Sequence, residues 1–322
     1  MEVKDFSVRK LRWLFWVGGL IILVGCKTTG QNLKSDDEFR KFFQSPPIGV
    51  SNKKNFNYPP PDAETLKQLP EMTATEHERL GDNYFIQENF PLACVHYEKS
   101  LQLDPGNTEV IYKKGILFLK SGLYDNALNE FQAILKKEPE HALAQEGMGQ
   151  VYFRKGNYLE AEKHFQEAIR ISPDLWKAHD FLGIIYDLNK QHEMAIKEFT
   201  AAIAIKPECG RLYNNLGTSY LMMGDFEKAI DSFHQALKLK FREKVVYNNL
   251  GLALYYVGRY SEALKVFIEA GDEAQAYNNL GCLYLEEGKR EEAITAFKKA
   301  IELRPSFYSQ AYENLKRAQL EE

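Results

Sequence analysis

Cysteine is scarce in this chain of 322 residues, with four at positions 26, 94, 209 and 282. No two of them form a CxxC pair and none lies near a histidine at the spacing of metal ligands, so we predict no metal site. An excess of charge of one sign is also absent, because 41 basic and 45 acidic residues give a formal net charge of −4. Without a positive excess to displace counterions from phosphates, nucleic acid is not an expected partner.

Motifs of catalysis are missing as well. None of the seven histidines pairs with a cysteine or serine in a recognisable nucleophile motif. The glycines are spread one per predicted helix and form no loop that could hold a phosphate. Carboxylates alternate with lysines on the predicted helix faces, which is typical of a solvated surface. We therefore predict a protein that is not an enzyme, with no cofactor and no small-molecule substrate.

Near the N-terminus, an apolar run of twelve residues from Trp13 to Val24 follows a basic segment. A helix that spans a bilayer needs about 20 residues, so this arrangement predicts a secretory signal instead. The run ends in Leu23-Val24-Gly25-Cys26, which resembles a bacterial lipobox. The resemblance implies that residues 1–25 are a signal peptide and that Cys26 carries a lipid and becomes the new N-terminus.

The alternative is an ordinary signal peptide or signal anchor in which Cys26 is incidental. Lys27 rather than aspartate follows the cysteine, and this resembles lipoproteins that enteric bacteria send to the outer membrane. We therefore expect a lipid-anchored protein of the bacterial cell envelope, at the periplasmic face of the outer membrane. Residues 26–72 include five prolines between positions 45 and 61, and we predict that they form a flexible tether.

The remainder of the chain repeats every 34 residues. Aligned glycines occur at Gly81, Gly115, Gly149, Gly183, Gly217 and Gly251, and Gly281 follows after 30. An alanine lies twelve residues after each glycine, and an aromatic residue lies four residues after each alanine. Each unit reads as two helices, such as 177–188 and 192–205. Because glycine in a helix costs about 1 kcal/mol relative to alanine, glycines in register imply close contact between the two helices.

This pattern resembles the tetratricopeptide repeat, or TPR. The resemblance implies an all-α fold, a right-handed TPR superhelix (α-solenoid) of about seven helix-turn-helix repeats in residues 73–322. The repeats are expected to start near 74, 108, 142, 176, 210, 244 and 274. A capping helix is expected over 308–320, with Tyr308, Tyr312 and Leu315 on its apolar face. The sixth unit lacks four residues, so we expect its second helix to be short.

In TPR arrays the first helices line a concave groove, and the resemblance implies that positions 2, 5, 6, 9, 12 and 13 of each unit face it. The candidate partner-binding residues are Asn214, Asn215, Asn248, Asn249, Asn278, Asn279, Lys177, Arg211, Tyr255 and Tyr256. An amide both donates and accepts, so a ladder of amides can pair with the backbone of an extended peptide. The alternative is that these amides bond within the scaffold, and that the tyrosines belong partly to the core.

Lipobox, tether and repeat array together resemble the pilus-assembly TPR lipoproteins of bacteria, of the TadD type, with the PilF and PilW proteins as siblings. This resemblance implies a membrane-tethered scaffold whose groove binds proteins or peptides during assembly of a pilus or secretion machine. The alternative is a TPR adaptor lipoprotein that regulates envelope hydrolases or proteases.

Overall fold

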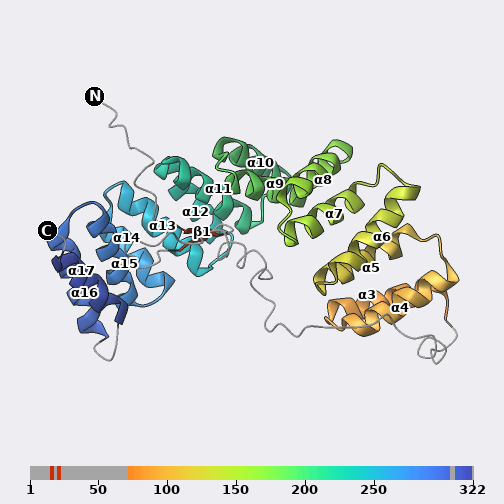
Figure 1. Cartoon of the computed structure of the whole chain (residues 1–322), viewed down its shortest axis with the longest axis horizontal. Helices are drawn as coiled ribbons and strands as arrows, with labels where there is room; N and C mark the ends of the chain where they lie inside the picture. Colours follow the sequence, from red (N-terminus) through yellow and green to blue (C-terminus); the bar gives the residue numbers. More distant parts are fainter. Residues whose placement is uncertain (1–14, 18–19, 23–71, 305–308, 321–322) are drawn as a thin grey trace. The chain divides into compact units, whose positions relative to one another are not determined.

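The computed structural model describes residues 15–17, 20–22, 72–304 and 309–320 (Figure 1). The predicted lipid-attachment residue Cys26 and residues 26–71 of the predicted tether lie outside this part of the chain. Strands β1 (Phe15–Val17) and β2 (Leu20–Ile22) form an antiparallel pair within the predicted signal peptide, with Trp16 opposite Ile21. From residue 72 onward the described chain contains helices and their connections only.

The described helices form seven hairpins and one final helix. The first helices of the hairpins are α3 (Ala74–Ile86), α5 (Thr108–Lys120), α7 (Ala142–Arg154), α9 (Trp176–Leu188), α11 (Gly210–Met223), α13 (Lys244–Tyr256) and α15 (Glu273–Glu286). The second helices are α4 (Phe90–Leu103), α6 (Tyr124–Lys137), α8 (Tyr158–Ile171), α10 (His192–Ile205), α12 (Phe226–Lys238), α14 (Tyr260–Ala270) and α16 (Arg290–Leu303). The final helix is α17 (Ser309–Leu320). The predicted all-α solenoid of helix-turn-helix repeats is confirmed.

The chain divides into two compact units, and the division falls inside α9. The N-terminal unit holds described residues 72–182, and the C-terminal unit holds the described helices from residue 183 onward. Within each unit, the second helix of one repeat packs against the first helix of the next, as α4 does on α5 and α12 on α13. First helices of successive repeats also contact each other directly, α5 with α7 and α11 with α13.

The repeated glycines are explained by the aromatic residue of the same repeat. A Cβ added to Gly81 would lie 2.5 Å from the ring of Tyr97, and one added to Gly217 would lie 2.7 Å from the ring of Phe233. The aromatic residues at this position are at most 1% exposed in all seven repeats. A real Cβ would overlap the ring, so only glycine lets the two helices approach to this distance.

Two departures from the regular repeat bear on the predictions. Helix α14 of the sixth repeat has 11 residues, whereas α12 has 13 and α16 has 14, so the expected short helix is present. In α17 the buried residues are Ala311, Asn314 and Ala318, whereas Tyr312 is 51% exposed. The predicted apolar face of this helix was wrong for Tyr312, because the packing face runs along Ala311, Asn314 and Ala318; Leu315 is half-buried and packs against the cluster of Cys282, Ala293 and Phe297 as predicted. Tyr308 lies outside the described residues.

Candidate functional site

The surface formed by the first helices is called the inner face here: α3, α5 and α7 in the N-terminal unit, and α11, α13 and α15 in the C-terminal unit. On each first helix, the repeat positions that are expected to face the groove point away from the second helix of the same repeat. Their side chains therefore do not pack within their own hairpin. The inner face is therefore where the predicted binding residues are expected to be accessible.

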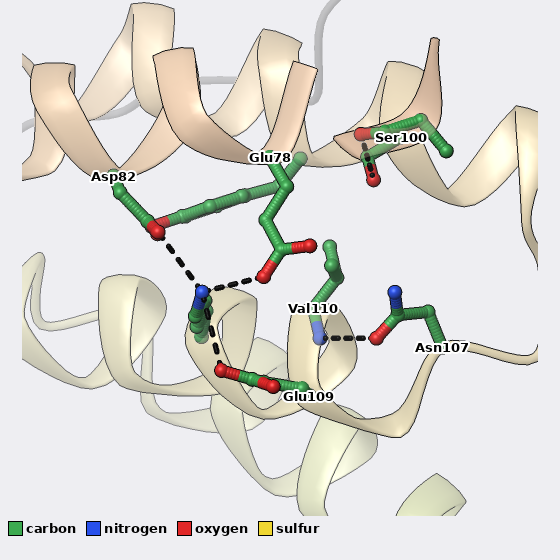
Figure 2. A network of polar contacts seen from close by, with 9 residues as sticks. Glu78, Asp82, Ser100, Asn107, Glu109 and Val110 are labelled. Carbon is green, nitrogen blue, oxygen red and sulfur yellow. Dashed lines mark hydrogen bonds and ion pairs between the residues drawn. The ribbon is translucent and has the colours of Figure 1, made fainter. Parts of the chain in front are cut away.

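A network of charges joins α3 to α5 on the inner face of the N-terminal unit (Figure 2). The Lys113 Nζ lies 2.6 Å from Glu78 Oε1, 2.9 Å from Asp82 Oδ2 and 3.4 Å from Glu109 Oε1. The Tyr97 hydroxyl donates to the other carboxylate oxygen of Asp82 at 2.8 Å. Burial lowers the pKa of Lys113, but the hydrogen bonds that it donates to Glu78 and Asp82 outweigh burial and leave that pKa above its usual value. One lysine thus offsets part of the charge of three carboxylates, and the network stays acidic.

Exposed apolar side chains lie on α3 and α7 of the same inner face. Ile86 at position 13 of the first repeat is 78% exposed, and Leu143 at position 2 of the third is 40% exposed. The Lys120 Nζ lies 4.8 Å from the ring centroid of Phe85, a cation–π contact at the same end of α3 and α5. Sequence reasoning missed these residues, although their repeat positions are among those expected to face the groove.

The predicted lysine of the N-terminal unit lies near a buried carboxylate. Lys177 is exposed, whereas Glu146 at position 5 of the third repeat is 3% exposed and accepts a hydrogen bond from Gln150 Nε2 at 2.7 Å. Burial raises the pKa of Glu146, and the charge of Lys177 acts in the opposite direction. Part of the positive charge expected from Lys177 is therefore balanced within the array.

Five of the six predicted asparagines are buried, and Asn248 alone among the six is half-buried. The Asn249 Nδ2 donates to Thr218 Oγ1 at 3.2 Å, and Asn314 Nδ2 of the final helix donates to Asn278 Oδ1 at 3.0 Å. Asn214 Nδ2 lies 3.4 Å from the side-chain oxygen of the adjacent Asn215, and Asn279 is 5% exposed. These hydrogen bonds agree with the alternative that the asparagines bond within the scaffold. Asn248 is the amide that a partner can reach.

The two predicted tyrosines differ in accessibility. Tyr255 is 1% exposed and packs against the rings of Tyr260 and Tyr284, with centroids 5.0 and 5.7 Å away. Tyr256 is half-buried and stacks on Phe226 at 4.9 Å. Arg211, also predicted, is half-buried on α11. Of the predicted residues in the C-terminal unit, Arg211, Asn248 and Tyr256 therefore reach the surface and Tyr255 belongs to the core.

Among the described residues, no group of three or more histidine, cysteine or acidic side chains could hold a metal ion. The described helices include none long and apolar enough to cross a membrane. Within the described part of the chain, Cys94, Cys209 and Cys282 form no disulfide, and burial raises the pKa of Cys94 to about 11. A thiol with this pKa is a poor nucleophile at neutral pH.

Comparison with known families agrees with this architecture. Sequence models described as tetratricopeptide repeat match residues 112–175, 177–209, 210–240, 245–270 and 274–307. Together these matches cover more than half of the chain, and the chain belongs to the tetratricopeptide repeat family. Repeats of this family form scaffolds that bind proteins or peptides and are generally not catalytic.

Individual relatives are distant. Over 73 residues the chain is 32% identical to tetratricopeptide repeat protein 37 of Xenopus laevis, which is 23% of this chain and 5% of that protein. A solved tetratricopeptide repeat protein of Parabacteroides merdae matches with a TM-score of 0.50 at 17% identity, covering 76% of this chain and 98% of that one. The solved PilF of Pseudomonas aeruginosa matches with a TM-score of 0.50 at 18% identity, covering 67% of this chain and 97% of that one. At these identities the two structures show the fold alone.

Proposed function

We propose that this protein is a lipid-anchored scaffold of the bacterial cell envelope, without catalytic activity, that binds protein partners on its inner face during assembly of a pilus or secretion machine. The repeat array supplies the binding surface. The predicted lipid at Cys26 and the tether over 26–72 hold that surface close to the membrane, at the periplasmic face of the outer membrane.

One observation carries the binding part of the proposal: side chains of different chemistry remain accessible along the inner face. In the C-terminal unit these are Arg211, Asn248 and Tyr256. In the N-terminal unit the exposed Ile86 and the acidic network around Lys113 lie on adjoining helices. Apolar anchors beside a few charged and amide groups are the composition expected of a surface that binds a peptide or a helix.

The envelope part rests on the N-terminal sequence. A basic segment, a short apolar run and a lipobox-like ending at Cys26 occur together, and a proline-rich segment follows. Two or three acyl chains give stable anchoring where one chain gives only marginal binding. The similarity to PilF supports the fold, and the assignment to pilus or secretion assembly comes from this arrangement of lipobox, tether and array.

Site-specific crosslinking in the native cell tests the binding surface. A photoreactive residue at Asn248 or Tyr256 should capture the same partner, because both positions are accessible on α13. The matched control is Leu159, which is 66% exposed on the second helix α8 and lies outside the inner face. Equal capture at Leu159 and at the two inner-face positions would contradict binding at this face.

The identity of the captured protein tests the assembly role. Capture of a pilus or secretion component would support the assembly role. Capture of an envelope hydrolase or protease would instead support the adaptor function. Fractionation tests the anchor separately: Cys26→Ser should release the protein from membranes. Unchanged membrane association of this variant would remove the lipid anchor from the proposal and leave the binding surface untouched.

A further inference from the structure

Two histidines face each other inside the first repeat. His77 on α3 and His96 on α4 are 0% and 4% exposed, and their Nδ1 atoms lie 3.1 Å apart. The ring of Tyr84 stacks on His96 with centroids 5.4 Å apart and an angle of 15° between the planes. A contact between two Nδ1 atoms at this distance holds one proton, which one ring donates and the lone pair of the other accepts.

A second proton cannot be accommodated in this contact. If both rings are protonated, two N–H groups point at each other and two positive charges lie in contact, so the hydrogen bond becomes a repulsion. Single protonation already places a charge in a buried site, where His77 Nε2 has no hydrogen-bond partner among the described residues. The bond between α3 and α4 therefore requires that at least one ring stay neutral.

The charged groups around the pair give little compensation. On α3, Glu76 favours protonation of His77, but its carboxylate accepts hydrogen bonds from the backbone and hydroxyl of Thr73 at 2.8 and 2.9 Å. On α4, Lys99 opposes protonation of His77. Burial lowers the pKa of both imidazoles, with the charge of Lys99 adding to the effect at His77.

The third repeat supplies a natural comparison at the same two repeat positions. Gln145 on α7 takes the place of His77, and His164 on α8 takes the place of His96. The His164 Nδ1 lies 2.7 Å from Gln145 Oε1, and Tyr152 stacks on His164 at 5.2 Å. An amide oxygen accepts from the imidazole whether that ring is neutral or charged, so this bond survives protonation.

The first repeat is also the terminal hairpin of the described array. A terminal repeat has a neighbour on one side only, and in repeat arrays such units open independently of the others. Here α4 packs on α5, and α3 is joined to α5 by the ion pairs of Lys113 with Glu78 and Asp82.

We propose that the first repeat is an acid-sensitive switch, in which hairpin α3–α4 is closed at neutral pH and opens below about pH 6 more readily than the hairpin of the third repeat. The direction follows from linkage. Protonation of His77 and His96 is disfavoured in the closed hairpin, so both bind protons more readily when it opens. The neutral pair therefore contributes its full stability to the hairpin above about pH 6.5, and this stability is lost as the pH falls.

Hydrogen exchange of the full chain measures this opening repeat by repeat. Protection factors, which divide out the intrinsic pH dependence of exchange, should fall at least about tenfold in α3 and α4 between pH 7 and pH 5. Burial lowers the pKa of His164 as well, so protection in α7 and α8 should also fall, but by less, because one buried histidine titrates there instead of two and its bond to the amide survives protonation. A constant protection in α3 and α4, or an equal fall in all four helices, would overturn the proposal.

Two exchanges of side chains between the repeats separate the histidine pair from other acid effects. His77→Gln copies the arrangement of Gln145 and should reduce the pH dependence of protection in α3 and α4 to that of α7 and α8. Gln145→His creates the pair with His164 and should make α7 and α8 lose protection at pH 5. If His77→Gln shows no protection at pH 7, the reciprocal variant decides. An undiminished loss of protection in His77→Gln, or no added loss in Gln145→His, refutes the switch.

Discussion

Replacing Gly149 by alanine tests how the two helices of a repeat fit together. A Cβ at this position would lie 2.7 Å from Cε1 and 2.8 Å from Cδ1 of Phe165, and Phe165 is fully buried. Alanine is favoured over glycine in a helix by about 1 kcal/mol, whereas overpacking a core costs about 1–3 kcal/mol. We therefore expect Gly149→Ala to lower the free energy of unfolding by up to about 2 kcal/mol.

A double-mutant cycle of Gly149→Ala and Phe165→Ala tests whether the ring of Phe165 causes this loss of stability. Phe165→Ala alone should cost about 3–5 kcal/mol, because it removes a fully buried ring. In that background the Cβ at position 149 no longer meets the ring, so Gly149→Ala should now stabilise the protein by about 1 kcal/mol through helix propensity. The sign of the same substitution thus reverses, and the coupling energy should be about 1–3 kcal/mol.

Urea unfolding followed by far-UV circular dichroism measures all four variants. Gly156→Ala is the control: Gly156 has φ +78° and nothing lies within 4 Å of its added Cβ, so its cost comes from the left-handed backbone. That cost, about 1–2 kcal/mol, should be the same with and without Phe165. Stabilisation by Gly149→Ala in the presence of Phe165, or a coupling below about 0.5 kcal/mol, would refute the packing argument.

Three further predictions concern buried polar groups, each checked by thermal or urea unfolding. Lys114 pairs with Glu98 and Glu130, so Lys114→Met should lower the free energy of unfolding by about 3 kcal/mol, because two carboxylates lose their cation. Adding Glu98→Gln and Glu130→Gln should recover most of the lost stability. No recovery in the triple variant would contradict this reasoning. Burial raises the pKa of Glu146, so its ionised form weakens the fold at neutral pH. Glu146→Gln should therefore be more stable than wild type at pH 7, and this advantage should shrink as the pH falls towards about 4.5; a difference that does not vary with pH would argue against it. Asn249 is fully buried, so Asn249→Ala should lower stability by about 1–2 kcal/mol and leave partner capture at Asn248 unchanged; lost capture in a stable variant would restore a binding role.

The sequence by itself determined the repeat and therefore the fold. Glycine, alanine and aromatic residues recur at fixed spacing, and each position has a local physical reason that needs no knowledge of distant contacts. A Cβ at Gly149 meets the aromatic ring of the same repeat, so the constraint is contained within about 34 residues. The short second helix of the sixth repeat was predictable for the same reason, since a missing turn of helix is visible in the spacing.

Tertiary structure alone decided which of the candidate residues can meet a partner. Six asparagines share two repeat positions, yet Asn248 is accessible while Asn249 donates to Thr218 of the preceding repeat. The repeat position of a residue determines the direction in which its side chain leaves the helix. The exposure of that side chain also depends on which residues of the neighbouring repeat pack against it. The same holds for His77 and His96, whose spacing of 19 residues is unremarkable in the sequence. Only the packing of α3 on α4 brings their ring nitrogens within 3.1 Å and makes one proton between them a condition of the closed hairpin.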